Sequence, residues 1–587
     1  MTGMEVRINN QPVQVSEGMT IMEACRLAGI RVPSLCYLKD VSQHASCGVC
    51  VVEVKGARSL MRACITRVSE GMEILTHSPR AEEARKVNVE LLLANHPQEC
   101  LTCDRNGSCE LQQLTFALGI SEKRFVRTRL TPFVKDESSR SLVRDPEKCI
   151  LCGRCVAVCN HLQQVRAIDF TGRGLKTKVS TFLDKGLGEV ACTNCGQCAL
   201  VCPTGAITEK SDVAAVRALL QQPGKVVLVQ TAPAVRVGIG EAMGMPYGSL
   251  VTGQMVAGLR RLGFTKVFDT NFAADLTIVE EGNELLRRLQ GGGILPMITS
   301  CSPGWIKFIE HFYPEQLAHL STCKSPQQMF GAVAKTYYAE QTGLDPRDIV
   351  VVSVMPCTAK KYEARRPGMD GAFQYWKERL QLNGEEHFYD VDYALTTREL
   401  ARMFRAAGID FTHLPEEPFD NPLGESTGAA VIFGSSGGVM EAALRTAYEL
   451  YTGKKPDSLD FRSVRGLQGI READISLNGT TIRVAVANTL KNAALLLDQI
   501  KNGTSPYTFI EVMTCPGGCL GGGGQPIPTN AEIREMRAAS IYFEDAHKSI
   551  RQSHENPEII KLYNEFLKEP LGERSHHLLH TTYQPRV

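Results

Sequence analysis

The sequence predicts a multidomain α/β and α+β protein in which small cysteine-rich modules precede a large α/β domain with parallel sheets. Most of the 21 cysteines fall in tight clusters between Cys36 and Cys202, and the longer remainder alternates short apolar strands with helical patterns. Such alternation favours parallel sheets covered by helices. A chain of 587 residues is also too long for one core, and at ~150 residues per domain it suggests about four domains.

The first segment, residues 1–78, has the pattern of a small β-grasp-like module. Residues 5–9 and 13–16 alternate polar and apolar side chains around Asn-Asn-Gln-Pro, which predicts a hairpin. Residues 19–27 then have helical spacing. We therefore expect a β-rich domain with one short helix at the start of the chain.

Two shorter modules are expected next. Residues 79–125 look helical, because residues 81–95 carry an apolar stripe that ends at His96-Pro97. Residues 126–208 open with a polar linker and contain two related cysteine runs, which are the only internal repeat found in the sequence.

The large domain should span residues 209–530, followed by a charged helical tail, residues 531–587, that packs on it. The expected strands are residues 226–230, 349–354, 430–433 and 482–486. The expected helices between them are residues 397–407 and 438–450.

Charge and hydropathy exclude several function classes. Lys and Arg number 65 against 64 Asp and Glu, so there is no electrostatic footprint for nucleic acid or for an anionic membrane surface. No run approaches the ~18 to 20 apolar residues of a membrane span, and the first residues lack a signal-peptide pattern. We expect a soluble, unexported, cytoplasmic protein without a nucleic-acid partner.

Cysteine spacing points to metal ligation. A secreted disulfide framework normally belongs to a much smaller chain. Cysteines two or three residues apart are poorly placed to pair with each other and well placed to converge on a metal. In a reducing cytoplasm this spacing therefore predicts metal sites.

The two repeated runs follow C-x2-C-x2-C-x3-C, the spacing of bacterial two-cluster ferredoxins. Each run supplies three thiolates to one 4Fe–4S cluster, and its fourth cysteine reaches the other cluster. One cluster is expected at Cys149, Cys152, Cys155 and Cys202, and the other at Cys192, Cys195, Cys198 and Cys159. The alternative is a pair of zinc sites, which typically use two separate C-x2-C halves.

Two more metal sites are expected upstream. The N-terminal module contains C-x10-C-x2-C-x13-C, which suits a 2Fe–2S cluster held by Cys36, Cys47, Cys50 and Cys64. The helical module contains H-x3-C-x2-C-x5-C, which suits a 4Fe–4S cluster with one imidazole ligand, held by His96, Cys100, Cys103 and Cys109. Structural zinc is the alternative for both sets.

Four such clusters in a line would carry single electrons to a reaction site. The remaining cysteines lie in the motifs TSCSPGW at 299–305, VMPCTAKK at 354–361 and EVMTCPGGCLGGGGQP at 511–526. Turns rich in glycine and flanked by proline let backbone approach a bulky inorganic centre, and the C-x3-C of the third motif is a plausible two-ligand clasp. The alternative is a set of buried structural cysteines in tight turns.

These three motifs resemble the signatures of the iron-only (FeFe) hydrogenase family, and the resemblance runs over essentially the whole chain, in the family's long, accessory-cluster form. The N-terminal half is also similar to the large iron–sulfur subunit of respiratory complex I. The resemblance implies an H-cluster: a 4Fe–4S cubane joined to a two-iron subsite with CO, cyanide and an azadithiolate. By motif, Cys357, Cys515 and Cys519 would ligate the cubane, with Cys519 as the bridge.

The resemblance also implies a pocket around the two-iron subsite. Lys360 matches a residue that hydrogen-bonds a cyanide, and Met355 and Met513 match residues that pack on the subsite. Pro233 and Ala234, in the stretch QTAPAVR, match another wall. Enclosure in apolar protein limits water and tunes the potential of such a centre.

One departure concerns the fourth cubane ligand. The family usually has two adjacent cysteines in the first motif, whereas this chain has Cys301-Ser302. Three routes are open: ligation by the Ser302 oxygen, by a turned Cys301, or by another thiol, for which Cys323 is the candidate. Oxygen suits iron–sulfur ligation less well than thiolate does, which places Cys323 or Cys301 ahead of Ser302. Cys25 is expected to be a buried structural thiol.

A proton relay is implied in the same way. Motif matching gives Cys301, Glu281, Ser321 and Glu284, with Arg288 at the outer end. The two glutamates lie three residues apart and would share one face of a helix. The alternative is a solvated acidic face.

The resemblance implies a catalytic subunit that interconverts protons and electrons with H2. No G-x-G-x-x-G in a strand–turn–helix context appears, so flavin and NAD(P) should bind other, diaphorase-type subunits, and ferredoxin is the simpler electron partner. Separate maturation proteins would insert the two-iron subsite. Two other functions are open: an electron-transfer subunit without a catalyst, and a hydrogen sensor on the same fold.

Overall fold

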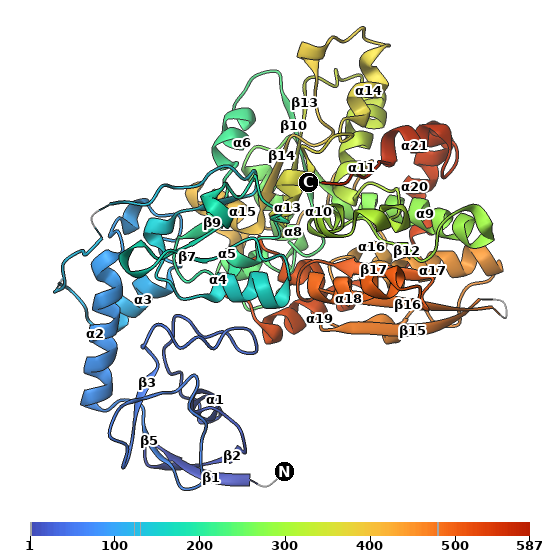
Figure 1. Cartoon of the computed structure of the whole chain (residues 1–587). Coiled ribbons are helices and arrows are strands. Elements are labelled where there is room, and N and C mark those ends of the chain that lie inside the picture. Colours follow the sequence, from blue (N-terminus) through green and yellow to red (C-terminus); the bar gives the residue numbers. More distant parts are fainter. Residues whose placement is uncertain (1–2, 123, 130, 478–479, 587) are drawn as a thin grey trace. The chain divides into compact units, whose positions relative to one another are not determined.

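The computed structural model describes residues 3–122, 124–129, 131–477 and 480–586. The chain forms two compact units (Figure 1): unit 1 is Met1–Val190 with Gln197–Thr208, and unit 2 is Ala191–Gly196 with Glu209–Val587. Within the described residues, no helix has the length and apolar character needed to cross a membrane.

Unit 1 begins with a five-stranded sheet in the order β2-β1-β5-β3-β4. The predicted hairpin is confirmed, because β1 (Gly3–Ile8) pairs antiparallel with β2 (Gln11–Ser16). β1 also pairs in parallel with β5 (Glu73–Leu75), and α1 (Ile21–Leu27) covers the core. A capping box between Thr20 and Glu23 starts this helix. The other two strands are β3 (Val51–Val54) and β4 (Met61–Arg62).

The rest of unit 1 is built from short helices and two-stranded sheets. The predicted helix at 81–95 is α2 (Pro79–Asn95), which Ser78 caps and which Pro79 begins. The remaining elements are α3 (Glu110–Ala117), β6 (Leu142–Arg144), α4 (Arg154–Ala157), β7 (Asp169–Thr171), β8 (Lys178–Ser180), α5 (Gln197–Val201) and β9 (Ile207–Glu209).

Unit 2 contains two sheets, which confirms the predicted α/β architecture. The first has the order β11-β10-β13-β14 and is parallel throughout. All seven residues of its strand β13 are buried, as expected for a strand with helices on both faces. The strands are β10 (Val226–Thr231), β11 (Lys266–Asp269), β13 (Ile349–Met355) and β14 (Tyr393–Thr396).

The second sheet has the order β12-β17-β16-β15. β12 and β16 run parallel to the central β17, while β15 is antiparallel to β16 at the edge. The strands are β12 (Met297–Ile298), β15 (Ile470–Leu477), β16 (Thr480–Asn488) and β17 (Phe509–Met513).

The strand predicted at 430–433 is wrong. These residues belong to α16 (Gly428–Ile432) and its C-cap Phe433, and all residues of the helix are buried. A short apolar run has no polar face, so its periodicity cannot distinguish a buried helix from a buried strand. The predicted helices at 397–407 and 438–450 are confirmed as α15 (Thr397–Ala406) and α17 (Gly438–Thr452).

The helix α9 (Thr270–Arg287) packs against the cores of both sheets. Its Phe272 and Leu276 join β10 and β13, and its Ala274 and Ile278 join α17 and β17. Because both sides of the helix are covered, its glutamates are buried as well. This burial of α9 raises the pKa of its residue Glu281, as described below.

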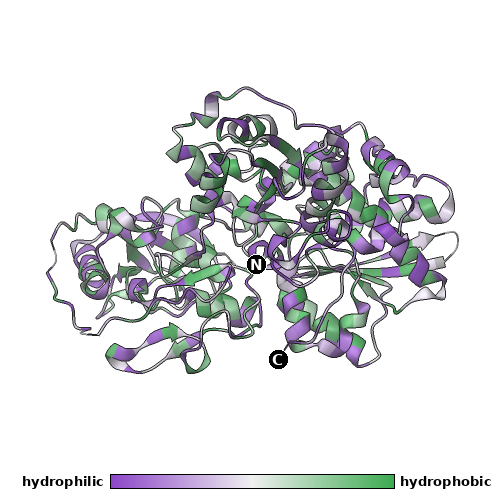
Figure 2. Cartoon of the chain, turned by 90° about the horizontal axis from the view of Figure 1, so that it is seen from above, coloured by the Kyte–Doolittle hydropathy of each residue, from purple (hydrophilic) through white to green (hydrophobic). Residues whose placement is uncertain are grey.

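The other helices of unit 2 pack on the sheets or on one another, and the last of them form the predicted tail. In Figure 2 many of the helical turns alternate between hydrophobic and hydrophilic colours, as expected for helices with one buried side. Those before residue 400 are α6 (Val213–Leu220), α7 (Ile239–Ala242), α8 (Thr252–Arg261), α10 (Pro303–Phe312), α11 (Pro326–Val333), α12 (Ala339–Thr342), α13 (Ala359–Glu363) and α14 (Gly371–Lys377). Those near the C-terminus are α18 (Leu490–Lys501), α19 (Ala531–His547), α20 (Pro557–Leu562) and α21 (Glu573–Leu579).

Candidate metal centres

The four cysteines of the N-terminal module are all buried. The sulfur atoms of Cys36 and Cys47 lie 3.4 Å apart, and the hydrogen bond between them lowers the pKa of the Cys36 thiol. The pKa of Cys50 is lowered to about 7, chiefly by a hydrogen bond from Cys64. In each pair one thiol thus stabilises the thiolate of the other, while the pKa values of Cys47 and Cys64 themselves are raised; the thiolate is the form in which sulfur binds metal.

The predicted set of one histidine and three cysteines lines one pocket, in which His96, Cys100, Cys103 and Cys109 lie together. Burial and the nearby Lys148 lower the pKa of His96 to about 4, so its imidazole is neutral, the form that binds metal. Its buried Nδ1 has no hydrogen-bond partner among the described residues. A Cβ on Gly205 would lie 2.8 Å from the sulfur of Cys103, so the chain leaves this space open. Together these features fit an iron–sulfur cluster.

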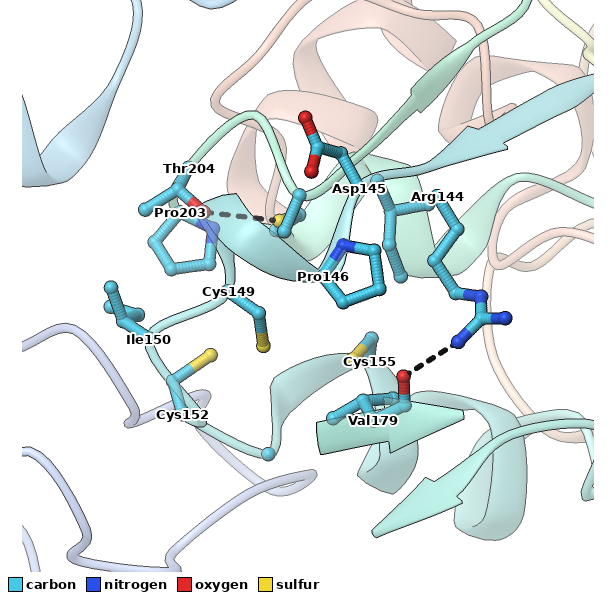
Figure 3. A pocket seen from close by; sticks show the side chains of 14 residues that line it. Arg144, Asp145, Pro146, Cys149, Ile150, Cys152, Cys155, Val179, Pro203 and Thr204 are labelled. Atoms are coloured by element: carbon cyan, nitrogen blue, oxygen red, sulfur yellow. Dashed lines mark hydrogen bonds between the residues drawn. The ribbon is translucent and has the colours of Figure 1, made fainter. Parts of the chain in front are cut away.

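The first ferredoxin set lines a second pocket of unit 1, shown in Figure 3. The sulfur atoms of Cys149, Cys152 and Cys155 point into a common space in that view. Cys202, from the second run, lines the same pocket, as the crossed pattern predicts. Burial raises the pKa of Cys149 to about 11, so these thiols remain protonated unless a metal replaces the proton.

The other ferredoxin set is divided between the two units. Cys159 and Cys198 belong to unit 1, where they lie on neighbouring helical segments. Cys192 and Cys195 belong to unit 2. Within unit 2 the Thr358 hydroxyl donates to the backbone oxygen of Asn194 at 2.7 Å.

In unit 2 the remaining motifs gather at the carboxyl ends of parallel strands. Pro233 follows β10, Cys357 follows β13, Cys301 follows β12 and Cys515 follows β17, each by two or three residues. The carboxyl ends of parallel strands are where α/β folds place their ligands. The fold therefore brings together motifs that lie far apart in the sequence.

Cys357, Cys515 and Cys519 are close enough to influence one another's ionisation. Burial, followed by the nearby Cys357, raises the pKa of Cys519 to about 12 and also raises the pKa of Cys515 well above its usual value. Cys195 is another charge neighbour of Cys515. Cys515 is buried, Cys357 and Cys519 are partly buried, and none of the three forms a disulfide, so they are a suitable donor set for an iron–sulfur cubane.

The turn that carries Cys519 depends on close backbone packing. Gly518 has φ of 77°, a conformation that favours glycine. A Cβ on Gly522 would overlap the backbone oxygen of Pro356, the residue before Cys357. The glycines therefore bring the Cys519 turn and the Cys357 loop into direct backbone contact.

The predicted pocket walls are buried around these thiols. Met355 and Met513 end the strands β13 and β17 and are both buried. The backbone oxygen of Ala234 accepts a hydrogen bond of 2.9 Å from Gln525, at the end of the third motif. These contacts place the wall at 230–236 against the segment that carries Cys519.

Lys360 connects the second motif to the first. Its ammonium donates to the backbone oxygen of Cys301 at 3.2 Å, to the Ser325 hydroxyl at 2.7 Å and to Glu363 at 2.9 Å. A buried cation fixed in this way can stabilise negative charge beside it.

Ser302 is the N-cap of α10, but its side chain does not cap the helix. Its hydroxyl lies 2.8 Å from the Thr514 hydroxyl, beside Cys515. Cys323 has different neighbours: its sulfur lies 3.8 Å from Glu284 Oε2, and its backbone pairs with His580.

Three of the predicted relay residues, Ser321, Glu284 and Arg288, are joined by hydrogen bonds. The Ser321 hydroxyl donates to Glu284 Oε2 at 2.9 Å, and Arg288 donates to Glu284 Oε1 at 2.6 Å. Glu281 is 1 % exposed, and neither of its carboxyl oxygens has a hydrogen-bond partner within the described part of the chain. Burial, followed by the Glu284 charge, raises the pKa of Glu281 to about 8.

The alternative of a solvated acidic face is wrong for these glutamates, since Glu280, Glu281 and Glu284 are all buried. Sequence reasoning missed the groups that surround them. His580, from the tail, contacts Glu280 at 3.1 Å and Thr322 at 2.7 Å. The histidines of the HLLH sequence at 577–580 were the only available hint of such a group. Nothing in the neighbouring sequence indicates that His580 contacts α9.

Comparison with known proteins identifies the family. The family described as iron only hydrogenase large subunit, C-terminal domain, matches residues 225–523. The chain belongs to the iron-only (FeFe) hydrogenases. It is a hydrogenase catalytic subunit with accessory iron–sulfur domains, an oxidoreductase acting on H2, which confirms the family resemblance.

Four further families match other parts of this hydrogenase. A 2Fe–2S iron–sulfur cluster binding domain matches residues 2–79, and the iron–sulfur binding region of NADH-ubiquinone oxidoreductase-G matches 85–124. A 4Fe–4S dicluster domain matches 148–206. The tail matches the iron hydrogenase small subunit at 531–586.

Individual relatives agree with this assignment. The hydrogenase is 48% identical to the NADP-reducing hydrogenase subunit HndD of Solidesulfovibrio fructosivorans over 100% of both chains. It is 40% identical to iron hydrogenase 1 of Clostridium pasteurianum over 98% of this chain and 99% of that one. A solved FeFe-hydrogenase of Chlamydomonas reinhardtii, 43% identical, aligns with a TM-score of 0.57 over 64% of this chain and 99% of that one.

The glycine contact gives a first prediction for the hydrogenase. Gly522 has φ of −58°, so Gly522→Ala adds no backbone strain but forces the Cys519 turn away from Pro356. We expect H2 evolution to fall at least about tenfold, because a small displacement of reacting groups is costly. The matched control is Gly384→Ala, where a Cβ meets nothing within 4 Å. Equal activity of the two variants would contradict the role given to this contact.

Proposed function

We propose that the chain catalyses the reversible reaction 2H+ + 2e− ⇌ H2 at an H-cluster held by Cys357, Cys515 and Cys519. The observation that carries the proposal is the convergence of these three thiols, with Lys360 near Cys519 and the buried Glu281 near Cys301. When bound, the H-cluster supplies the metal and the azadithiolate amine at which protons and electrons combine.

The residues around the cubane thiols prepare the site. Lys360 presents a buried ammonium, which supports its proposed role as a hydrogen-bond donor to cyanide. Met355 and Met513 supply apolar, polarisable surface at two strand ends. Pro233 and Ala234 close a further side. Exclusion of water by such walls strengthens the electrostatic effect of Lys360.

Protons are proposed to travel through Cys301, Glu281, Ser321 and Glu284, with Arg288 at the outer end. The hydrogen bonds from Ser321 and from Arg288 to Glu284 support the outer half of this path. Glu281 supports the inner half, because a carboxyl with a pKa of about 8 holds and releases a proton near neutral pH. After burial, Glu281 is the largest cause that raises the pKa of the Cys301 thiol, which supports their proximity.

For the fourth cubane ligand, we propose the Ser302 oxygen. The Ser302 side chain makes no capping hydrogen bond to its own helix, and its hydroxyl contacts that of Thr514, the residue before Cys515. Cys323 is surrounded instead by Glu284, Glu281 and Glu280, and Cys301 is needed for the relay. These contacts favour Ser302 over both thiols, although sulfur is the better ligand by chemistry alone.

Electrons are proposed to pass along one 2Fe–2S and three accessory 4Fe–4S clusters on the ligand sets predicted above. The last cluster of this series would be next to the cubane, because its ligand Cys195 belongs to the same unit as Cys515 and is its charge neighbour. The contact between Thr358 and Asn194 fixes this segment beside the Cys357 loop.

Replacing His96 tests the accessory series. We expect His96→Ala to slow viologen-driven H2 evolution several-fold, because a pocket with three thiols holds its cluster less well. Isotope exchange between D2 and water, which needs no external electrons, should fall less. Cys25→Ala is the control, since Cys25 is a buried thiol of the core. Equal losses in both assays would contradict a role limited to electron transfer.

Partners and compartment follow from the same proposal. The name of the Solidesulfovibrio relative, an NADP-reducing hydrogenase subunit, supports flavin-containing, NAD(P)-linked diaphorase subunits as partners, with ferredoxin as the simpler alternative. Maturation proteins would insert the two-iron subsite. The many metal-binding thiols support the cytoplasm as the compartment.

Infrared spectroscopy and iron analysis of anaerobically matured protein test the site. We expect stretching bands of CO and cyanide, lost in Cys519→Ala, together with iron for the H-cluster and four accessory clusters. Full iron content without CO or cyanide bands would overturn the proposal and leave an electron-transfer protein.

A further inference from the structure

A second group of possible metal ligands lies beside the relay. Glu284 on α9, Cys323 and the tail residue His580 each offer one ligand atom, and these atoms lie within 4.8 Å of one another. Cys323 is fully buried, while Glu284 and His580 are each 8% exposed. The backbone bridge between Cys323 and His580 holds the tail in this position.

The imidazole of His580 is oriented as in many metal sites. Its Nε2 lies 3.1 Å from Glu280 Oε2, and Glu280 also accepts hydrogen bonds from Tyr563 at 2.5 Å and from the Leu571 amide at 2.9 Å. Since an ionised carboxylate only accepts, Nε2 carries the proton in the neutral ring. This leaves the lone pair of Nδ1 facing Thr322. A carboxylate behind a histidine is the usual support of a metal-binding imidazole.

The spacing of the other ligands fits a tetrahedral ion. The Cys323 sulfur lies 3.8 Å from Glu284 Oε2, and donors around tetrahedral zinc stand about 3.5 Å apart for bonds of about 2.0 to 2.3 Å. A set of one sulfur, one imidazole nitrogen and one carboxylate oxygen selects zinc-like cations over Mg²⁺ or Ca²⁺. Small side-chain shifts would therefore complete the site.

We propose that Glu284, Cys323 and His580 form a binding site for a thiophilic divalent cation such as Zn²⁺ or Cd²⁺. The Cys323 S–H bond breaks as the metal–sulfur bond forms, and its proton leaves to solvent. His580 Nδ1 and a Glu284 oxygen supply lone pairs, and a water molecule completes four positions. No electron is transferred in this step.

The consequence for turnover rests on the proposed relay. Glu284 Oε2 is the atom that accepts the hydrogen bond from Ser321. A cation on Glu284 would remove this acceptor and place positive charge in the proton path. Binding should therefore inhibit H2 turnover reversibly.

Zinc binding is tested on the matured, iron-loaded protein. Zinc is added, the excess is removed by gel filtration, and zinc and iron are counted per protein. We expect one retained Zn²⁺, with one sulfur at about 2.3 Å and nitrogen or oxygen at about 2.0–2.2 Å by X-ray absorption. It should be lost in Cys323→Ala and in His580→Gln and kept in Cys25→Ala.

The site would be overturned by equal zinc retention in Cys323→Ala and His580→Gln, or by a zinc shell without sulfur. A shell of several sulfurs with loss of iron would also overturn it, because zinc would then have replaced a cluster. A separate turnover assay tests the relay. Zinc should slow viologen-driven H2 evolution at least tenfold, and a chelator should restore the rate. Zinc bound as proposed with unchanged turnover supports the site and contradicts the relay.

Discussion

Glu281→Gln is expected to lower the rate of H2 evolution by about 10²- to 10⁴-fold, the usual contribution of a positioned proton-transfer group. Glutamine has nearly the same shape but cannot release a proton to Cys301 or to Ser321. Burial raises the pKa of Glu281 to about 8, so the native carboxyl is protonated at neutral pH. The loss should therefore come from the broken relay and leave cluster assembly intact.

The same variant should be more stable than the native protein at neutral pH. Between a pKa of 4.5 in the unfolded chain and about 8 in the folded one, the folded state binds more protons, and its stability falls as pH rises. At about 1.4 kcal/mol per pKa unit this cost is roughly 3 kcal/mol at pH 7. Glutamine removes the cost, so the gain in melting temperature should be larger at pH 7 than at pH 5.

Both effects are measured on protein with verified iron content and CO bands. The matched control is Asp275→Asn on the same helix, where burial raises the pKa to about 6 but Thr427 and Asn556 hydrogen-bond the carboxylate. The control should lose stability and keep its turnover per assembled site. A Glu281→Gln variant with native turnover would contradict the relay.

Ser302→Ala is expected to release cubane iron and to reduce H2 evolution at least tenfold, whereas Ser302→Cys should retain both. The reason is position: the Ser302 hydroxyl lies beside Thr514 and Cys515, and alanine offers no ligand atom. The cysteine variant should change the electron paramagnetic resonance spectrum of the cubane, because ligand identity sets cluster properties.

Two outcomes would contradict the serine assignment. If Ser302→Ala keeps its cubane iron while Cys323→Ala loses it, Cys323 is the ligand, and the separate cation site fails with it. If Ser302→Ala keeps its iron while Cys301→Ala loses it, Cys301 ligates and cannot relay protons. Iron analysis and spectra of the three variants separate these cases.

The sequence predicted the elements whose signals are local. The Val-rich runs became β10 and β13 because four or more consecutive apolar residues flanked by turns suit a strand buried on both faces. Cysteine spacing likewise predicted the set that lines the pocket in Figure 3, including the crossed ligand Cys202. The strands were predicted from local runs, and the cluster set from the spacing within each cysteine run together with the repeat of that run.

Other features depend on contacts between distant parts of the chain. The run at 430–433 forms a helix because α16 is buried among other helices, and its periodicity carried no information about that environment. Burial of Glu281 follows from the packing of α9 against both sheets. His580 reaches Glu280 across 300 residues of sequence, so spacing alone could not assign it.

The central claim is that this chain, with Cys301-Ser302 in its first motif, is a working hydrogenase. The most direct test is H2 evolution from reduced viologen by anaerobically purified protein matured with the two-iron subsite, with and without CO. We expect fast evolution that CO inhibits. No evolution, despite verified iron loading and subsite insertion, would contradict the claim and leave an electron-transfer protein or a sensor.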